Sequence, residues 1–198
     1  MHPNRAFHAD PAALSEQFGA IAFGRVFLTT TAGPRVGHAP MLVVAPDRIR
    51  FHLANANALV PHLPGATALL LAEGPRAYIS ANWYPDPRGA VPTWNYVAVE
   101  AEGVVSPIDR DALIALLDDL SAELEPRVGE NWTRDKMAPA RFDAMLNAIT
   151  GFEMHVTVWR GTHKLSQNQP TEIATTLAGH IDRTGDPAIA MLMRQARA

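Results

Sequence analysis

The chain has 198 residues, no cysteine and a formal net charge of −3, with 47% hydrophobic and 19% charged residues. The absence of cysteine excludes disulfides, thiolate metal sites and cysteine nucleophiles, and it fits a reducing compartment. No apolar run approaches the ~20 residues that cross a bilayer, and the first residues lack the apolar core of a signal peptide. We therefore expect a cytoplasmic protein with no membrane contact.

The N-terminal part is typical of one short helix followed by strands. Asp10-Pro11 predicts a helix start, because an aspartate N-cap precedes a proline at the first helical position. A turn is expected at Gly74-Pro75. The β-rich runs between turn residues predict short strands at 26–31, 36–44, 48–53, 66–72 and 76–80. These runs leave little room for crossover helices, so antiparallel pairing is favoured over a parallel βαβ fold.

The second half alternates between strand and helix patterns. Residues 95–105 predict a half-buried strand, with Asn95, Val97 and Val99 on one face. Leucines at helical spacing after Asp109 predict a helix, and further helices are expected after Pro139, Pro170 and Asp186, with a strand at 152–158. The sequence thus predicts a mainly β (α+β) fold: a small antiparallel barrel decorated with helices at 1–169, and a helical extension at 170–198.

Aromatic residues concentrate in one hairpin between residues 78 and 99. This stretch holds two of the four tryptophans and all three tyrosines. Amide and hydroxyl groups lie beside the rings, and the candidate binding residues here are Ser80, Trp83, Thr93, Trp94 and Asn95. Flat rings next to fixed donors and acceptors favour a flat heteroaromatic ligand.

Histidines and asparagines give a second group of candidates. His38, His52 and His62 lie on or near neighbouring predicted strands, but without metal-ligand spacing a hydrogen-bonded or surface role is favoured over a metal site. His52 leads into a strand end with Asn55 and Asn57, where free amide donors would suit a phosphate. Asparagine is also a common turn former, and spacing alone favours a plain turn.

The segment 164–168 places a lysine, a serine and two amides directly after a strand. Lys164, Ser166 and Gln167 suit a phosphate or the polar edge of a ring, whereas a solvated loop capping the next helix explains them equally well. No nucleophile-elbow glycines flank Ser80 or Ser166, and no glycine-rich phosphate loop occurs. Acyl-transfer catalysis, Rossmann and P-loop nucleotide binding are therefore disfavoured.

Four strings in this order resemble one family: Tyr78-Ile-Ser-x-x-Trp-Tyr, Val91-Pro-Thr-Trp-Asn-Tyr, Gly151-Phe-Glu and Lys164-Leu-Ser-Gln-Asn. The chain is similar over roughly residues 1–180 to the PaiB-type FMN-binding proteins, often described as FMN-binding negative transcriptional regulators. The resemblance implies an antiparallel split β-barrel of the FMN-binding type, like that of pyridoxamine-phosphate oxidases. It also implies a homodimer with the flavin at the subunit interface.

The resemblance assigns cofactor contacts by position. His38 would line the flavin; His52, Asn55 and Asn57 would meet the phosphate; Thr93, Trp94 and Asn95 would lie at the interface; and Lys164 and Gln167 would close the site, with Ser80 and Trp83 in the first string. The family pattern has an arginine where this chain has Asn55 and a proline where it has Ala58. A phosphate dianion would lose a bidentate partner worth ~1.5–3 kcal/mol.

Three functions follow from these observations. A flavin-binding regulator is implied by the resemblance, but the chain shows no helix-turn-helix signature and no basic stripe, which counts against DNA as a partner. A flavin-dependent oxidoreductase acting on a small molecule is the alternative, because flavin carries the redox chemistry without a catalytic acid or base. The third is a dimeric barrel that has lost its cofactor, suggested by Asn55.

Overall fold

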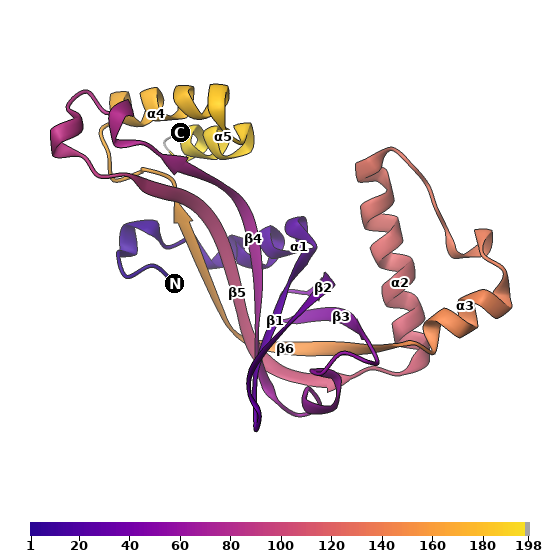
Figure 1. Ribbon diagram of the computed structural model, residues 1–198. Coiled ribbons are helices and arrows are strands. Elements are labelled where there is room, and N and C mark those ends of the chain that lie inside the picture. The colour runs from indigo at the N-terminus through magenta and orange to yellow at the C-terminus, as the bar shows by residue number, and fades with distance from the viewer. Residues whose placement is uncertain (197–198) are drawn as a thin grey trace. The chain divides into compact units, whose positions relative to one another are not determined.

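The computed structural model describes residues 1–196 and contains six strands, which form a closed antiparallel barrel in the order β1-β2-β3-β6-β5-β4 (Figure 1). The strands are β1 Phe23–Thr30, β2 Gly33–Ala45, β3 Arg48–Ala54, β4 Thr67–Ile79, β5 Thr93–Pro107 and β6 Ile149–Lys164. Pairing of Arg25 with Leu71 between β1 and β4 closes the sheet. The mainly β, helix-decorated antiparallel barrel predicted from the sequence is confirmed.

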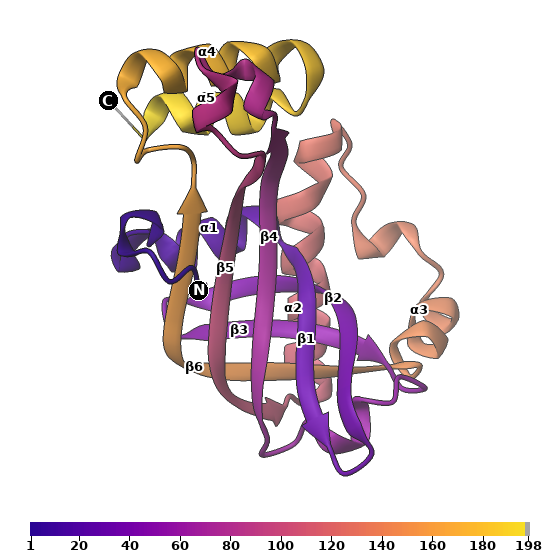
Figure 2. The ribbon, with the colours of Figure 1, turned by 60° about the vertical axis from the view of Figure 1, so that its left-hand side comes forward.

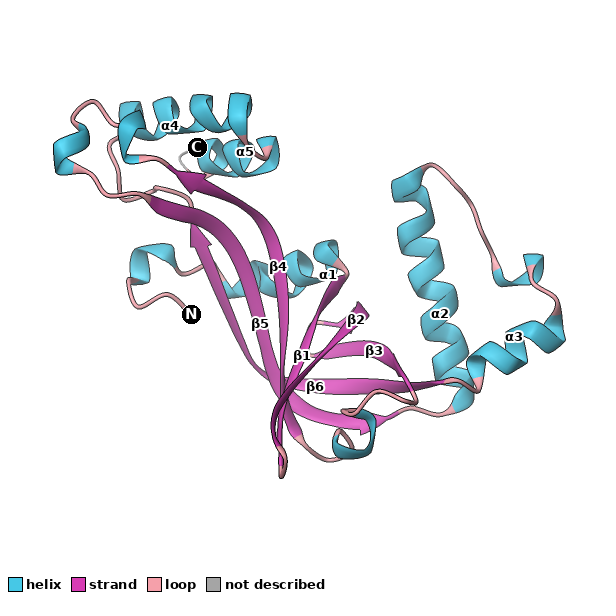
Figure 3. Cartoon of the chain, viewed as in Figure 1, coloured by secondary structure: helices cyan, strands magenta, loops and turns pink. Residues whose placement is uncertain are grey.

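The α-helices are α1 Leu14–Ile21, α2 Arg110–Leu124, α3 Pro139–Leu146, α4 Thr171–Thr184 and α5 Pro187–Gln195 (Figure 3). The predicted caps are in place: Asp109 accepts a hydrogen bond from the Ala112 amide at 2.8 Å, and Asp186 accepts one from Ala188 at 2.9 Å. Asp10 caps a short 3₁₀ turn, Pro11–Ala13, which leads directly into α1. No helix within residues 1–196 is long and apolar enough to cross a membrane.

The predicted break at Gly74-Pro75 is wrong, because β4 continues through both residues. A Cβ atom on Gly74 would lie 3.1 Å from the Cβ of Val97, so glycine permits the close approach of β5 at this point. β1 pairs with β4 only at Leu69–Leu71, and a proline without an amide donor is tolerated beyond that pairing. A strand-compatible Gly-Pro pair was therefore mistaken for a turn.

Contacts within the chain group it into two compact units. Unit 1 contains Met1–Leu14, Glu73–Val99 and the described residues from Arg160 onward, and unit 2 contains Ser15–Ala72 and Glu100–Trp159. These units cut across the division at residue 169 expected from the sequence, which stays a prediction. In unit 1, α4 and α5 lie side by side (Figure 2) and bury Leu177, Ile181 and Ile189 against Ile79 and other apolar residues.

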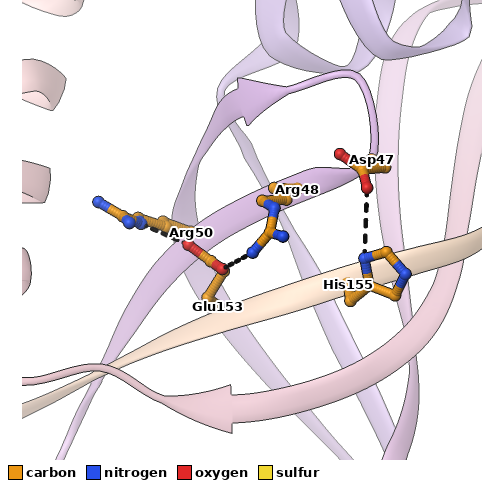
Figure 4. Close-up of polar contacts among 5 residues, drawn as sticks. All are labelled: Asp47, Arg48, Arg50, Glu153 and His155. Carbon is orange, nitrogen blue, oxygen red and sulfur yellow. Dashed lines mark hydrogen bonds and ion pairs between the residues drawn. The ribbon is translucent and has the colours of Figure 1, made fainter.

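An ion-pair cluster fixes the register of β3 and β6 in unit 2 (Figure 4). Glu153 accepts hydrogen bonds from Arg48 and Arg50, each at 2.8 Å, and His155 lies 3.4 Å from Asp47. Burial acts to raise the pKa of Glu153, but the hydrogen bonds and charges of Arg50 and Arg48 together lower it. Because a one-residue slip would separate these charges, the cluster favours the observed pairing.

Candidate functional site

The segment after β6 and the start of β5 meet in unit 1. The Lys164 ammonium donates a hydrogen bond to the Thr93 hydroxyl, and its nitrogen lies 6.0 Å from the centroid of the Phe7 ring. Burial lowers the pKa of Lys164. A half-buried ammonium held by one neutral hydroxyl and one ring has no carboxylate among these contacts. The position therefore favours an anionic or carbonyl group of a ligand.

A buried polar pair lies beside this lysine. The Asn95 side chain donates to the Ser166 hydroxyl at 2.9 Å and to the Met193 sulfur at 3.3 Å. Ser166 has φ of +60°, a left-handed conformation that is uncommon for residues other than glycine. Such a conformation costs of order 1–3 kcal/mol and clusters at functional sites. The Asn95–Ser166 bonds hold the loop in this shape.

Gln167 fixes the same loop to the N-terminal segment. Its side-chain oxygen accepts from the Leu165 amide at 2.7 Å, and its nitrogen donates to the carbonyls of Ala6 at 3.0 Å and His163 at 2.5 Å. The side-chain amide of Gln167 thus positions the loop by bonding to backbone groups of Ala6, His163 and Leu165. A direct cofactor contact from Gln167 stays a prediction.

These residues border a cavity of about 680 Å³ that lies within unit 1. Thr93, Asn95, Lys164 and Ser166 supply part of its polar surface, and Phe7, Tyr84, Val91 and Ile173 supply apolar and aromatic surface. The remaining lining residues are His2, Pro85, Asp86, Gly89, Ala90, Asn168 and Gln169. A cavity of this size, with a few convergent polar groups, is typical of a small-molecule site.

The other predicted hairpin residues do not line this cavity. Ser80 caps the 3₁₀ turn Ala81–Trp83 by accepting from the Asn82 amide at 3.2 Å. Trp83 stacks on His180, with ring centroids 5.0 Å apart. Trp94 is 51% exposed and packs edge-on against Tyr78. The aromatic rings of the hairpin are therefore spread over several environments.

The predicted phosphate segment belongs to unit 2, and its amides are engaged locally. Asn55 donates to the Asn147 carbonyl at 2.8 Å and accepts from the Thr150 hydroxyl at 2.7 Å. Asn57 accepts from the Leu59 amide at 3.0 Å. These bonds close a turn and join it to the start of β6, which is the plain-turn interpretation of this segment. A phosphate contact from Asn55 or Asn57 stays a prediction.

The histidines of unit 2 are also separate from the Lys164 cavity. His52 lies on β3 with a buried Nδ1 that has no hydrogen-bond partner, and burial lowers its pKa. His38 is exposed on β2 and stacks with Phe23 at 6.5 Å between centroids. Within residues 1–196, no group of three or more metal-binding side chains is arranged to hold a metal ion.

Comparison with known proteins identifies the family. The model of a family described as "Putative FMN-binding domain" matches residues 1–158. The chain belongs to this FMN-binding family. It is 32% identical over 152 residues to "Protease synthase and sporulation protein PAI 2" of Bacillus subtilis (strain 168), which covers 75% of this chain and 72% of the relative.

Solved structures show the same fold at low identity. The flavocytochrome Anf3 from Azotobacter vinelandii matches with a TM-score of 0.64 and 17% identity, over 82% of this chain and 72% of that one. The conserved hypothetical protein Rv2991 from Mycobacterium tuberculosis matches with a TM-score of 0.60 and 15% identity, over 86% and 94%. The barrel of this chain is thus a fold shared with a flavocytochrome.

The residues around Lys164 fit the cofactor of this family. FMN presents a phosphate, ring carbonyls and a flat apolar ring system. The cavity offers the Lys164 cation, hydroxyl and amide groups, and the rings of Phe7 and Tyr84, and the carboxylate of Asp86 that also lines it is paired with Arg88. Lys164 lies beyond residues 1–158, which the family model matches. Its assignment to the site therefore rests on its place in the lining of the cavity. The sequence did not predict Phe7, Tyr84 and Ile173 as lining residues of this cavity. The sequence signal for Ser166 was the polar segment 164–168.

Proposed function

We propose that this protein binds FMN in the Lys164 cavity as a homodimer and acts as a PaiB-type negative transcriptional regulator. The observation that carries the proposal is the convergence of Lys164, Thr93 and the Asn95–Ser166 pair on one cavity of a chain that belongs to an FMN-binding family. When bound, flavin supplies redox chemistry. The protein's own residues would bind and orient it: Lys164 and Thr93 at a polar edge, and Phe7 and Tyr84 along the ring.

The dimer part of the proposal is supported by exposed aromatic surface. Trp94 and Tyr78 are about half exposed, at 51% and 48%, and Val91 is 76% exposed. Thr93 and Asn95, which flank Trp94 in the sequence, both line the cavity. Aromatic residues are enriched in interface cores, so a partner seated on Trp94 would contact the segment that forms the site.

The regulatory part of the proposal draws on the relative, whose name connects it with protease synthesis and sporulation. The charge distribution counts against DNA binding, and it therefore favours the alternative function, a flavin-dependent oxidoreductase. The net charge is −3, and arginines such as Arg110, Arg127 and Arg194 form ion pairs with carboxylates of the same chain. Paired arginines contribute little to a basic surface for DNA.

Three measurements on the purified protein test these functions. The absorbance spectrum should show bound flavin, and a gel-shift titration with the DNA upstream of its own gene should give a salt-sensitive shift at micromolar protein. Bound flavin without any shift would contradict the regulator. Bleaching of the flavin by NADH or NADPH under anaerobic conditions would then support the oxidoreductase. Absence of flavin after reconstitution with FMN would contradict both functions.

A further inference from the structure

Unit 2 contains two adjoining cavities, of about 800 and 430 Å³, which the FMN site does not explain. Most of their lining residues come from α2, α3 and the segment that connects these helices, and residues common to both cavities include Asp118, Trp132, Arg134 and Phe142. Their lining belongs entirely to unit 2, whereas the Lys164 cavity belongs to unit 1. The two sets of cavities share no lining residue, although His52, which the family resemblance places at the flavin phosphate, lines the smaller cavity of unit 2.

The smaller cavity has an apolar wall. Leu120 and Leu146 are buried there, and Met145, Leu117 and Ile149 add aliphatic surface. Phe142 lines both cavities, and so does Trp132, which is 37% exposed. This surface suits an apolar ligand that contains aromatic groups.

The larger cavity carries an excess of carboxylates. Asp118, Glu125, Glu130 and Asp135 line it, and Arg134 is the one lysine or arginine among the lining residues of either cavity. Glu125 accepts a hydrogen bond from the backbone amide of Trp132 at 3.0 Å, which holds the backbone of Trp132 beside this carboxylate. The field in this cavity therefore favours a cation.

Arg134 shows that the cavity wall already binds a cation. Its guanidinium lies 3.1 Å from the Asp118 carboxylate and 5.3 Å from the centroid of the Phe142 ring. A carboxylate together with an aromatic face is the usual environment for an organic cation in proteins. Both partners of the pair are partly exposed, at 42% and 41% of their side chains, so Arg134 can be displaced from this position.

We propose that these adjoining cavities form a second ligand site, which binds an amphipathic organic cation bearing aromatic groups. The aromatic groups occupy the apolar wall at Leu120 and Leu146, and the positive charge takes the place of the Arg134 guanidinium between Asp118 and Phe142. When no ligand is bound, the Arg134 guanidinium occupies the position of the ligand's positive charge. The ligand must displace it, and this competition lowers the affinity of the site for the cation.

Tetraphenylphosphonium and tetraphenylborate are a cation and an anion of matched shape, and titration calorimetry of the full-length protein with each tests the proposal. The cation should bind and the anion should not. Asp118→Asn should weaken cation binding about three- to fivefold, and Phe142→Leu, which keeps an apolar side chain but removes the aromatic ring, should weaken it by a similar factor. Arg134→Ala should tighten it about three- to fivefold, whereas Arg134→Lys should stay near the wild type.

Binding of both ions with equal affinity, no binding to either the wild type or Arg134→Ala, or no effect of Asp118→Asn would overturn the proposal. Weaker cation binding in Arg134→Ala would also overturn it. The alternative is that a second copy of this chain covers the cavities. The mass of each variant in sedimentation tests this alternative. A shift of Asp118→Asn or Arg134→Ala from the wild-type mass toward monomer would mean that the chain itself covers the cavities. Bound flavin, followed by absorbance, should be the same in all variants.

Discussion

Two polar loops begin at the last residues of strands, residues 164–169 at the end of β6 and residues 54–57 at the end of β3, and they have different structural roles. In the first, Lys164 and Ser166 border a cavity, and Ser166 holds a left-handed conformation. In the second, Asn55 and Asn57 bond to nearby backbone and hydroxyl groups and close a turn. The difference teaches that polar composition at a strand end does not identify a binding site. Side chains of both loops bond to their own chain, and the loops differ because only the first has side chains that also border a cavity.

The strongest way to break this comparison is to give the second loop the charge that it lacks. Asn55→Arg should tighten FMN binding about tenfold to a hundredfold if this loop meets the phosphate, because a charge-assisted hydrogen bond contributes ~1.5–3 kcal/mol. Titration with riboflavin, which has no phosphate, is the control. An equal gain for both flavins, or no gain for FMN, would show that residue 55 does not face the phosphate.

Truncating Asn95, the buried β5 residue that bonds to the first loop, should reduce stability and FMN binding together. Asn95→Ala leaves the Ser166 hydroxyl without its Asn95 partner in a buried position, which we expect to cost about 1–3 kcal/mol in the free energy of unfolding. Urea unfolding and FMN titration measure the two effects. Asn55→Ala, at an exposed position in the second loop, should cost less than about 1 kcal/mol. Similar losses in both variants would remove the distinction between the loops.

The exposed tryptophan next to the first loop tests whether that loop belongs to a shared site. Trp94→Ala should weaken the homodimer about tenfold and release flavin at the same protein concentration. Sedimentation combined with absorbance follows both quantities. A wild-type protein that is monomeric at low micromolar concentration and still carries flavin would contradict the shared site.

The smallest expected effect is a pH dependence of stability, which a buried histidine contributes in each of the two units. Burial lowers the pKa of His52 on β3 and of His163 next to Lys164, both from a usual value of 6.5. The unfolded chain therefore binds these protons more readily, and stability should fall as the pH drops below 6.5 toward the lowered values. His52→Gln and His163→Gln should each make this fall less steep in urea unfolding. An unchanged slope in either variant would contradict the corresponding burial effect.

Much of the fold could be predicted from local patterns. Alternation of burial along β5, which places Asn95, Val97 and Val99 inside, and the cap at Asp109 follow from spacing and side-chain chemistry. A turn is expected at Gly74-Pro75 because glycine and proline disfavour a strand locally. The close approach of Val97 on β5, which glycine permits, depends on the tertiary structure and not on the local sequence. For the same reason the cavity contacts of Phe7 and Tyr84, and the local partners of Asn55, could not be predicted from sequence.

The central claim is that Lys164, rather than the loop at Asn55, anchors the flavin in this chain. The most direct measurement is the dissociation constant of FMN for the wild type, Lys164→Ala and Asn55→Ala, with the unfolding of each cofactor-free protein followed in parallel. Our account predicts that Lys164→Ala weakens FMN binding about tenfold or more and leaves stability nearly unchanged, because a half-buried lysine contributes little to folding. It predicts a small effect for Asn55→Ala. Wild-type affinity in Lys164→Ala, or a larger loss in Asn55→Ala, would contradict it.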